Sequence, residues 1–354
     1  MKVLKLKFEN FRNIENIEII PEKEMNVIFG ENAQGKTNIL EGIWLFTGAK
    51  SFRGAKDNEY INFNSGKKAE LELTFEAEGI EKEAKIEIEE KRISFLNGKN
   101  LKFASSLAGI FNAIVFSPND LRLISDGPSQ RRRFLDTAIG QLYPQYIELL
   151  RNYSRAVTQR NKLIKDFKYD STVSVMLDSF EEEIAQSGEK IVLYRKKYID
   201  LLNLFLPAVY DGLSEGKEKL ETTYISSFEG NFLEELKKRR KEDMFSATTS
   251  IGPHRDDIDF KINGYSARSF GSQGQKRSIA LSLKLAEAEV INKNVGEWPI
   301  FILDDVMSEL DPKRQNFILN KIEGMQVFLT CCEPSNVKNL NKGKIFNVKE
   351  GCIL

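Results

Sequence analysis

One eight-residue motif constrains the fold of this chain more than any other feature. An apolar run at residues 25–29 leads into GENAQGKT, and an apolar-striped segment follows from Asn38. This is GxxxxGK[ST] between a predicted strand and a predicted helix, the context in which the pattern forms a phosphate-binding loop. Glycines let backbone amides face an anion, and the helix that follows directs its positive end at the same place. The sequence therefore predicts an α/β domain that binds a nucleotide.

Each side chain of the motif has an expected role. Lys36 supplies a cation for the β- and γ-phosphates of ATP, and the hydroxyl of Thr37 is a ligand for Mg²⁺. The alternative is a structural glycine turn without a ligand. The predicted ATP-binding residues are Gly30, Glu31, Asn32, Ala33, Gln34, Gly35, Lys36 and Thr37.

A pair of carboxylates follows a second apolar run, at residues 299–303. A phosphate-binding loop needs a carboxylate from a neighbouring strand to hold the metal. Asp304 is the predicted metal-side residue, and Asp305 is predicted to orient or deprotonate the attacking water. The alternative is that one or both aspartates cap the helix that follows. Lys36, Asp304 and Asp305 are thus the predicted catalytic residues.

A short polar segment, Ser272-Gln273-Gly274-Gln275, precedes a long apolar-striped helix. A serine at a helix N-cap gives a small, positively polarised site for an anion. The segment resembles the signature motif of ABC-type ATPases, in which the serine reaches the γ-phosphate of ATP bound to the opposing subunit. Ser272, Gly274 and Gln275 are therefore expected to act across a dimer. Asp311, in the sequence SELD, resembles the D-loop of the same ATPases.

The whole chain resembles the RecF family, part of the wider group of SMC-like ATPases. The matching segments are FENFRN at residues 8–13, the phosphate-binding loop, KSFR at 50–53, VFSPNDLRLI at 115–124, RRRFLD at 131–136, GPHRDD at 252–257, SQGQKR at 272–277 and LDDVMSELD at 303–311. The resemblance implies an ABC-type ATPase head with an antiparallel β lobe and an inserted helical arm. It also implies that Arg12 lies near the adenine.

The resemblance implies a function as well. RecF-like proteins form ATP-dependent homodimers, bind duplex and gapped DNA, and act with RecO and RecR in replication-linked repair and the SOS response. Asp305 stands where most ABC ATPases have glutamate, so a weak, DNA-dependent ATPase that acts as a switch is expected. Two departures from ABC-type ATPases are the absence of a Q-loop glutamine near residues 116–120 and a Cys331-Cys332 pair in place of a switch histidine.

The chain is expected to divide into three parts. Residues 1–125 form the N-terminal part of the head, residues 126–244 form the helical arm, and residues 245–354 complete the head. Apolar residues recur at three, four or seven positions through the predicted arm, which is typical of amphipathic helices. Alternating apolar residues over 69–90 predict an antiparallel hairpin, and Asn97-Gly98 predicts another tight turn.

The charge is zero overall but uneven along the chain. The 52 basic residues equal the 52 acidic ones, yet residues 69–90 hold nine glutamates and two lysines, and residues 131–168 hold nine basic and three acidic residues. A local DNA-binding surface is therefore compatible with the composition. The DNA-binding candidates are Lys50, Arg53, Lys56, Arg131, Arg132 and Arg133. The three consecutive arginines have an alternative role, since they could tie the arm to the acidic head. The basic run at residues 237–241 is interpreted as a solvated helix with internal ion pairs.

Three cysteines without a CxxC pair favour a reduced, cytoplasmic protein over a disulfide scaffold or a zinc site. No membrane segment is expected, because no long uncharged apolar run occurs. His254, the one histidine, is interpreted as a structural hydrogen-bonding residue rather than a catalytic one. Two other functions stay open: a small-molecule kinase with a phosphate-binding loop, and a chromosome-structure ATPase of the cohesin kind.

Overall fold

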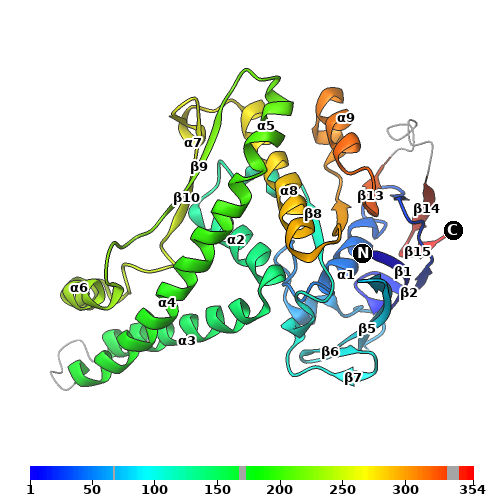
Figure 1. The fold of residues 1–354 in the computed structure, drawn as a ribbon. Coiled ribbons are helices and arrows are strands. Elements are labelled where there is room, and N and C mark those ends of the chain that lie inside the picture. Colours follow the sequence, from blue (N-terminus) through cyan, green and yellow to red (C-terminus); the bar gives the residue numbers. More distant parts are fainter. Residues whose placement is uncertain (67, 167–172, 333–342) are drawn as a thin grey trace.

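The computed structural model describes residues 1–66, 68–166, 173–332 and 343–354. It has a head, built from both ends of the chain, and an arm that extends to one side of it (Figure 1). Within the described residues the head holds two six-stranded sheets and the arm a three-stranded one. The predicted fold class, an ABC-type head with a helical insertion, is confirmed.

The first sheet carries the phosphate-binding loop. Its strands pair in the order β15-β14-β3-β13-β12-β8, and all neighbouring pairs are parallel except β14 with β15. Because parallel strands end at the same edge, the loops after β3 and β12 come together there. The strands are β3 (Met25–Phe29), β8 (Ala113–Phe116), β12 (Ile300–Leu303), β13 (Val327–Cys331), β14 (Lys344–Lys349) and β15 (Cys352–Ile353).

The second sheet is the β lobe, and its strands pair in the order β2-β1-β4-β5-β6-β7, all antiparallel. The hairpin predicted over residues 69–90 is β4 with β5, and the turn predicted at Asn97-Gly98 joins β6 to β7, so both predictions are confirmed. Lys85 pairs with Glu70 at 2.7 Å and Glu87 at 2.9 Å on its acidic face. The strands are β1 (Lys2–Phe11), β2 (Ile14–Ile19), β4 (Ala69–Ala77), β5 (Ile80–Ile88), β6 (Arg92–Leu96) and β7 (Lys99–Asn100).

Helix α1 (Lys36–Leu45) lies between these two sheets. Ile39, Leu40 and Ile43 are completely buried, in one cluster with side chains of both sheets. Burial of three such aliphatic side chains contributes several kcal/mol, about 1.5–3 kcal/mol each. The start of α1 is therefore fixed relative to both sheets of the head.

The arm holds long helices and a small sheet. Strand β9 pairs with β10, and β10 with β11, so the sheet joins segments on both sides of residue 244, which lies inside α6. The helical pattern did not predict β9, because six residues of strand carry too few positions to show their own period. The elements are α2 (Pro128–Leu142), α3 (Pro144–Asp166), α4 (Val173–Asn203), α5 (Leu206–Ser214), β9 (Leu220–Ile225), α6 (Phe232–Ser246), β10 (Asp257–Ile262) and β11 (Tyr265–Ser266).

A buried ionic network ties three of these helices together. Arg160 of α3 donates to Glu181 of α4 at 2.9 Å and to Asp243 of α6 at 2.7 Å, and all three side chains are inaccessible. On the exposed face of α6, Lys238 pairs with Glu235 and Lys237 with Asp178. The internal ion pairs interpreted for the run at 237–241 are present for Lys238 and Arg239, whereas Lys237 and Arg240 pair with α4.

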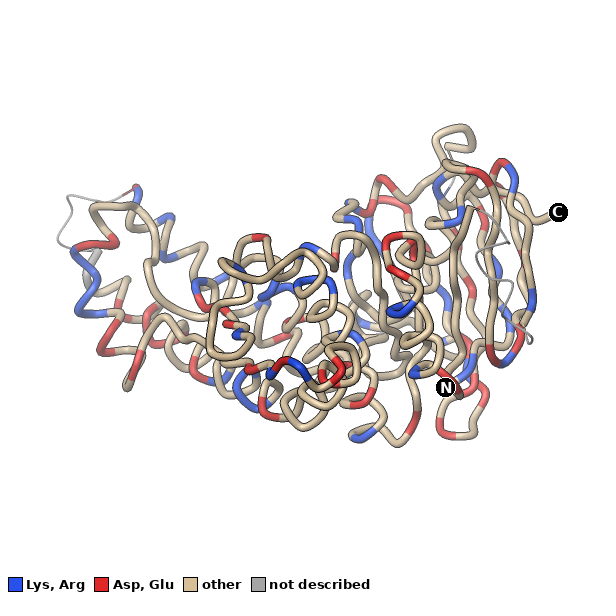
Figure 2. Tube along the Cα trace, turned by 90° about the horizontal axis from the view of Figure 1, so that it is seen from above, with Lys and Arg blue, Asp and Glu red and all other residues tan. Residues whose placement is uncertain are grey.

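The chain returns to the head through α7 (Ala267–Phe270), α8 (Gln273–Val295) and α9 (Pro312–Lys321). Acidic and basic positions are interspersed over head and arm alike (Figure 2). Residues 167 and 168, at the end of the basic segment, lie outside the described residues. Among the helices described, none is both long and apolar enough to cross a membrane.

Candidate functional site: a phosphate-binding loop and its carboxylates

The phosphate-binding loop turns sharply between β3 and α1. Gly35, the N-cap of α1, has φ 108°, and a Cβ atom there would lie 2.8 Å from Oδ1 of Asn13. The left-handed backbone favours glycine at this position, and a larger residue would also displace the Asn13 side chain. Ala33 also has a positive φ, of 65°, and such non-glycine outliers often occur at ligand sites.

Backbone N–H groups of the phosphate-binding loop are free to donate hydrogen bonds to a ligand. Among the described residues, none accepts a hydrogen bond from the backbone N–H groups of residues 32–37. Lys36 is buried, and its Nζ donates to the carbonyl oxygens of Gly30 at 2.6 Å and Glu31 at 2.8 Å. A nest of free amides at a helix N-terminus with a lysine inside it is a site for the phosphates of a nucleotide.

Thr37 and Asp304 meet beside the loop. The Thr37 hydroxyl donates to Oδ1 of Asp304 at 2.8 Å, and Thr330 donates to the same oxygen at 3.1 Å. Asp304 is buried, and burial raises the pKa of its carboxyl. A buried carboxylate without a cationic partner favours a cation beside it. A hydroxyl, one carboxylate, phosphate oxygens and water form the usual environment of Mg²⁺, and no group of three acidic, cysteine or histidine side chains forms a separate metal site in the described chain.

Asp305 has a different environment from its neighbour. Its backbone is left-handed, with φ 50°, and its N–H donates to the Thr330 hydroxyl at 2.8 Å. Its side chain lines a cavity of about 160 Å³ together with Asn32 and Ser308. The two aspartates therefore project into different places, Asp304 toward Thr37 and Asp305 into a cavity that also borders the phosphate-binding loop.

The predicted signature segment begins α8. Ser272 is the N-cap and accepts from the Gln275 N–H at 3.2 Å, while Gln275 Oε1 accepts from the Ser272 N–H at 2.7 Å. Ser272 itself is exposed. The expected N-cap is therefore present, at the end of a long helix whose positive end is open to a partner.

Arg314, which the sequence did not single out, joins the signature to the predicted D-loop. It donates to the Gly274 carbonyl at 3.0 Å and to Ser278 Oγ at 2.9 Å, and it pairs with Asp311. Asp311 is the N-cap of α9. The signal in the sequence was the position of Arg314 three residues after Asp311, which places it in the first turn of a capped helix.

A second unpredicted residue, Glu41, organises the side of α1. Its carboxylate is completely buried, pairs with Arg12 at 2.7 Å and lies 3.7 Å from Arg53. Arg12 lies over the Tyr60 ring at 5.2 Å, and Arg53 donates to Asn38 Oδ1 at 2.9 Å. The structure thus holds Arg12 and Arg53 against α1, close to the phosphate-binding loop.

The DNA-binding candidates fall into three groups. Lys50 and Lys56 are exposed. Arg132 donates to the Asp256 carbonyl at 2.8 Å, and the exposed Arg133 donates to the Ser51 carbonyl. Arg131 is buried, and its Nε donates to Asp257 at 2.6 Å.

Arg131 therefore has a structural role, and its proposed contact with DNA is corrected. Its guanidinium also donates to the carbonyl oxygens of Leu123, at 3.0 Å, and Asp126, at 2.8 Å. Four of the five N–H donors of this guanidinium therefore have an acceptor within the protein, and the side chain is buried away from any phosphate outside. The alternative for the arginine cluster was a tie between the arm and the head. Arg131 instead joins α2 to β10 within the arm and to the segment that precedes α2.

His254 is hydrogen-bonded at both ring nitrogens. Nε2 lies 3.0 Å from the Thr249 carbonyl oxygen and Nδ1 lies 2.6 Å from the Tyr153 hydroxyl. Since a carbonyl can only accept, the proton is on Nε2 and Nδ1 accepts from Tyr153. Burial lowers the pKa of His254, so the ring is held neutral. These contacts fit the structural role interpreted from the sequence.

A phosphate-binding loop, a carboxylate on the neighbouring strand, a capped signature helix and a β lobe define an ABC-type ATPase head of the kind found in SMC proteins. Comparison with known proteins agrees: the family model described as the RecF/RecN/SMC N-terminal domain matches residues 2–353. The chain belongs to the RecF family.

Relatives match over the full length. The DNA replication and repair protein RecF of Lachnoclostridium phytofermentans is 37% identical, over 100% of this chain and 99% of that protein. RecF of Agathobacter rectalis is 38% identical, over 99% and 98%. A solved structure described as the recombination mediator protein RecF-ATPrS in the RecFOR pathway is 34% identical with a TM-score of 0.92, covering 99% of this chain and 97% of that one. The Smc head domain of Pyrococcus furiosus, at 17% identity and a TM-score of 0.56, shares the fold.

Proposed function

We propose that this protein is an ATP-dependent, DNA-binding recombination mediator. ATP drives its dimerisation on duplex and gapped DNA, and slow hydrolysis releases it. The observation that carries the proposal is the contact of Thr37 with Asp304 at 2.8 Å, beside a loop with free amides, in a chain that matches RecF proteins along its whole length. A nucleotide site that is merely a relic would not keep this geometry.

ATP and Mg²⁺ fit the residues at the loop. The predicted loop residues would hold the phosphates through their amides, with Lys36 moving from its two carbonyl partners onto the β- and γ-phosphates. Thr37 and Asp304 would hold Mg²⁺, which neutralises charge that develops on the phosphates. Arg12, fixed by Glu41 and by the Tyr60 ring, would lie against the adenine.

Dimerisation is proposed through the signature helix. The exposed Ser272, with Gly274 and Gln275, would meet the γ-phosphate held by the second copy. An exposed aromatic pair supports an interface here, since Tyr265 is 70% and Phe270 is 76% exposed, with their rings 6.4 Å apart. The Arg314 link gives the D-loop residue Asp311 a fixed place beside the same surface.

Hydrolysis would be slow. Asp305 is the proposed group that orients or deprotonates water, and its carboxylate has a shorter reach than the glutamate of most ABC ATPases. The strained backbone at Asp305 supports a role that depends on where its carboxylate points. The ATPase therefore suits a timer rather than a motor.

DNA would lie on the basic side chains near the junction of head and arm, the exposed Lys50, Lys56 and Arg133 and the half-buried Arg132. The partners RecO and RecR, and a cytoplasmic location, are proposed from the family alone. Contacts of this kind go to phosphates and are not expected to select sequence.

Two other functions receive less support. A small-molecule kinase needs an acceptor pocket with its own base next to the γ-phosphate, and the cavity at Asp305 is small, about 160 Å³. A chromosome-structure ATPase of the cohesin kind shares the fold, but the arm here is short. DNA-stimulated conversion of ATP to ADP and phosphate, without another phosphorylated product, would separate the proposed function from a kinase.

The test is the binding of gapped, duplex and single-stranded DNA with and without ATP at several salt concentrations. ATP should increase retention on duplex and gapped DNA, and the effect should weaken with salt. The Lys36→Ala variant is the matched control, because it should lose the ATP effect and keep the weak basal binding. If ATP changes binding to none of the three substrates, the proposed function is wrong.

A further inference from the structure

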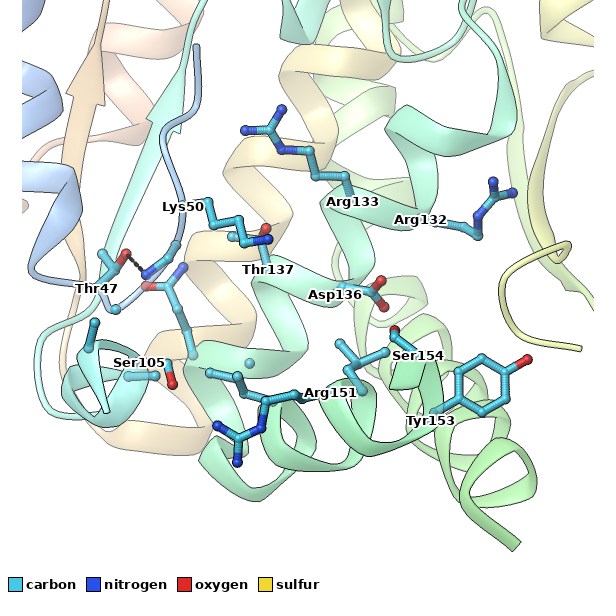
Figure 3. Close-up of a pocket in the computed structure, with 18 of the residues that line it drawn as sticks. Thr47, Lys50, Ser105, Arg132, Arg133, Asp136, Thr137, Arg151, Tyr153 and Ser154 are labelled. Atoms are coloured by element: carbon cyan, nitrogen blue, oxygen red, sulfur yellow. Dashed lines mark hydrogen bonds between the residues drawn. The ribbon is translucent and has the colours of Figure 1, made fainter. Parts of the chain in front are cut away.

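A larger cavity than the one at Asp305 lies between head and arm, apart from the phosphate-binding loop. It has a volume of about 910 Å³ and is lined by the segment after α1, by the 3₁₀ helix η2 (Ala104–Leu107), by α2 and α3, and by Pro253 and His254 (Figure 3). We call it the head-arm pocket. The ten residues of α1, about 15 Å of helix, separate it from Lys36 at the opposite end. It is therefore not part of the ATP site.

The pocket is strongly basic. Among the described residues that line it, Asp136 is the single acidic side chain, and Arg195 pairs with it at 2.8 Å. Of the other cations, Arg151 pairs with Glu148, outside the lining, at 3.5 Å. The remaining four lining cations form no ion pair with a described residue. The basic residues of the lining are Lys50, Arg92, Arg132, Arg133, Arg151 and Arg195.

Several donors around the pocket have no partner. The side-chain nitrogens Nε of Arg92, Nε2 of Gln141 and Nε of Arg151 are buried without a hydrogen-bond acceptor in the described chain. Buried donors are normally paired, and each unpaired one costs about 1–3 kcal/mol. Lys50 points into the pocket from the head side, across from Arg133, and Arg151 lies on the α3 side (Figure 3). Unpaired donors and uncompensated cations on several walls favour an anion.

The volume of the pocket and its apolar residues restrict the kind of ligand that can bind there. Pockets of about 300–1,000 Å³ hold small ligands, so a nucleotide unit fits and a duplex does not. Ile147 and Leu150 add an apolar side to the same cavity. A phosphate for the cations and a base or sugar for the apolar wall match a nucleotide better than a simple inorganic anion.

We propose that the head-arm pocket binds one nucleotide unit through its phosphate. The unit comes either from an unpaired segment of a DNA strand or from a free nucleotide. The first source rests on the proposed DNA-binding function, and the second does not. With a strand as the source, the duplex lies outside on the exposed cations, while the first unpaired nucleotide enters between head and arm.

Ligand binding to the pocket can be measured through the NMR signals of the lone histidine. His254 lines the pocket, and the chain has no other histidine, so its imidazole proton signals in NMR are unambiguous. Thymidine 5′-monophosphate and a short oligo-dT without terminal phosphates are titrated into the Lys36→Ala variant, in which the ATP site is silent. Both the monophosphate and the oligonucleotide should shift the His254 signals, and uncharged thymidine should not.

Substitutions of single lining residues test whether the ligand binds inside the head-arm pocket. Arg151→Gln and Lys50→Gln should each weaken the titration by about tenfold, as expected for loss of one charge-assisted hydrogen bond. Arg155→Gln is the matched control, because Arg155 is exposed on the same helix and does not line the pocket. Circular dichroism and the unperturbed His254 spectrum verify that the variants fold.

Each outcome of the titration either supports or contradicts the proposal. A shift with the oligonucleotide assigns the strand as the source, and a shift with the monophosphate alone assigns a free nucleotide. Equal shifts with thymidine, no shift at all, or equal effects of Arg151→Gln and Arg155→Gln would overturn the proposal. Since this titration needs no ATP, its failure would leave the ATP-dependent DNA binding of wild-type protein untouched. Failure of that DNA binding would in turn leave the free nucleotide as the ligand of the pocket.

Discussion

Thr37 and Asp304, which are 267 positions apart in the chain, meet through a hydrogen bond of 2.8 Å from the Thr37 hydroxyl to the Asp304 carboxylate. The contact exists because β3 and β12 both lie beside β13 and run in the same direction. It joins the N-terminal and C-terminal parts of the head in a single site, and it is the point at which the proposed function is most directly tested.

The two neighbouring aspartates should separate binding from hydrolysis. Asp304→Asn removes the proposed metal carboxylate and should weaken Mg²⁺-dependent ATP binding by about 10–100-fold, a typical cost at a metal site. Asp305→Asn should keep ATP affinity and lower the hydrolysis rate by about 100-fold or more. Isothermal titration with and without Mg²⁺, followed by single-turnover hydrolysis, measures both. Identical behaviour of the two variants would contradict the roles proposed here.

Ser272 should be needed for ATP-dependent dimerisation but not for ATP binding. Ser272→Arg places a bulky side chain at the proposed interface, so ATP binding should persist while ATP-dependent dimers disappear. Lys293→Glu, at the far end of the same helix α8, is the control and should dimerise normally. Light scattering with chromatography in ATP reports the outcome, and dimers of the Ser272→Arg variant would remove the signature assignment.

The buried arginine of the arm should be important for stability. Arg160→Met leaves Glu181 and Asp243 buried without their shared partner, and the free energy of unfolding should drop by about 3–5 kcal/mol. Arg155→Met, on the exposed side of the same helix, should change it by about 0.5 kcal/mol or less. Urea unfolding of the full chain measures the difference. A cost for Arg160→Met no larger than for Arg155→Met would show that the network is not structural.

Acidification should destabilise the arm through His254. Burial lowers the pKa of its ring, so the unfolded chain takes up a proton near pH 6.5 while the folded chain does not. The free energy of unfolding should therefore be constant above that pH and fall as the pH drops from the unfolded toward the folded pKa. NMR titration of the lone histidine gives the folded pKa directly, and His254→Gln should flatten the pH dependence of stability. A folded pKa above 6.5 would reverse the expected sign.

The three cysteines should react unequally. Cys332 is exposed, with its Sγ 3.6 Å from Lys36 Nζ and 3.1 Å from Asn32 Oδ1, whereas Cys331 is buried and burial raises the pKa of its thiol. Maleimide should modify Cys332 and the exposed Cys352 but not Cys331. ATP should protect Cys332 alone, so Cys352 is the internal control in peptide mass spectrometry. Equal labelling of Cys332 with and without ATP would place the nucleotide elsewhere.

Much of the site was predictable from local sequence. The phosphate-binding loop, the carboxylates after a buried strand and the N-cap at Ser272 each depend on a few consecutive residues, whose backbone geometry their own side chains dictate. The β4–β5 hairpin was also predictable from the sequence. Burial alternates over nine residues in each strand, so the apolar residues recur with a clear period of two.

Other features required long-range packing. Strand β9 pairs with β10 along its six residues. Thr222, Thr223 and Tyr224 favour a strand, but the segment is too short to interrupt the helical prediction around it. Arg131 looked like its two neighbours in sequence, but the face of α2 that it occupies turns inward to Asp257. Glu41 owes its role to Arg12 and Arg53, and Arg314 owes its link to the signature segment to Gly274 and Ser278, all of them partners that lie outside the local sequence.

The sequence by itself determined the phosphate-binding loop, the carboxylates after a buried strand and the capped start of α8, since each is encoded within one short segment. Only the tertiary structure decided which cations are free. Folding pairs Arg131, Arg195 and Arg151 with carboxylates, holds Arg53 against α1, and leaves Lys50 at a cavity without an ion pair to a described residue. The physical reason is that the partners of a charged side chain come from segments far apart in the chain. The local sequence therefore does not show whether the side chain is paired.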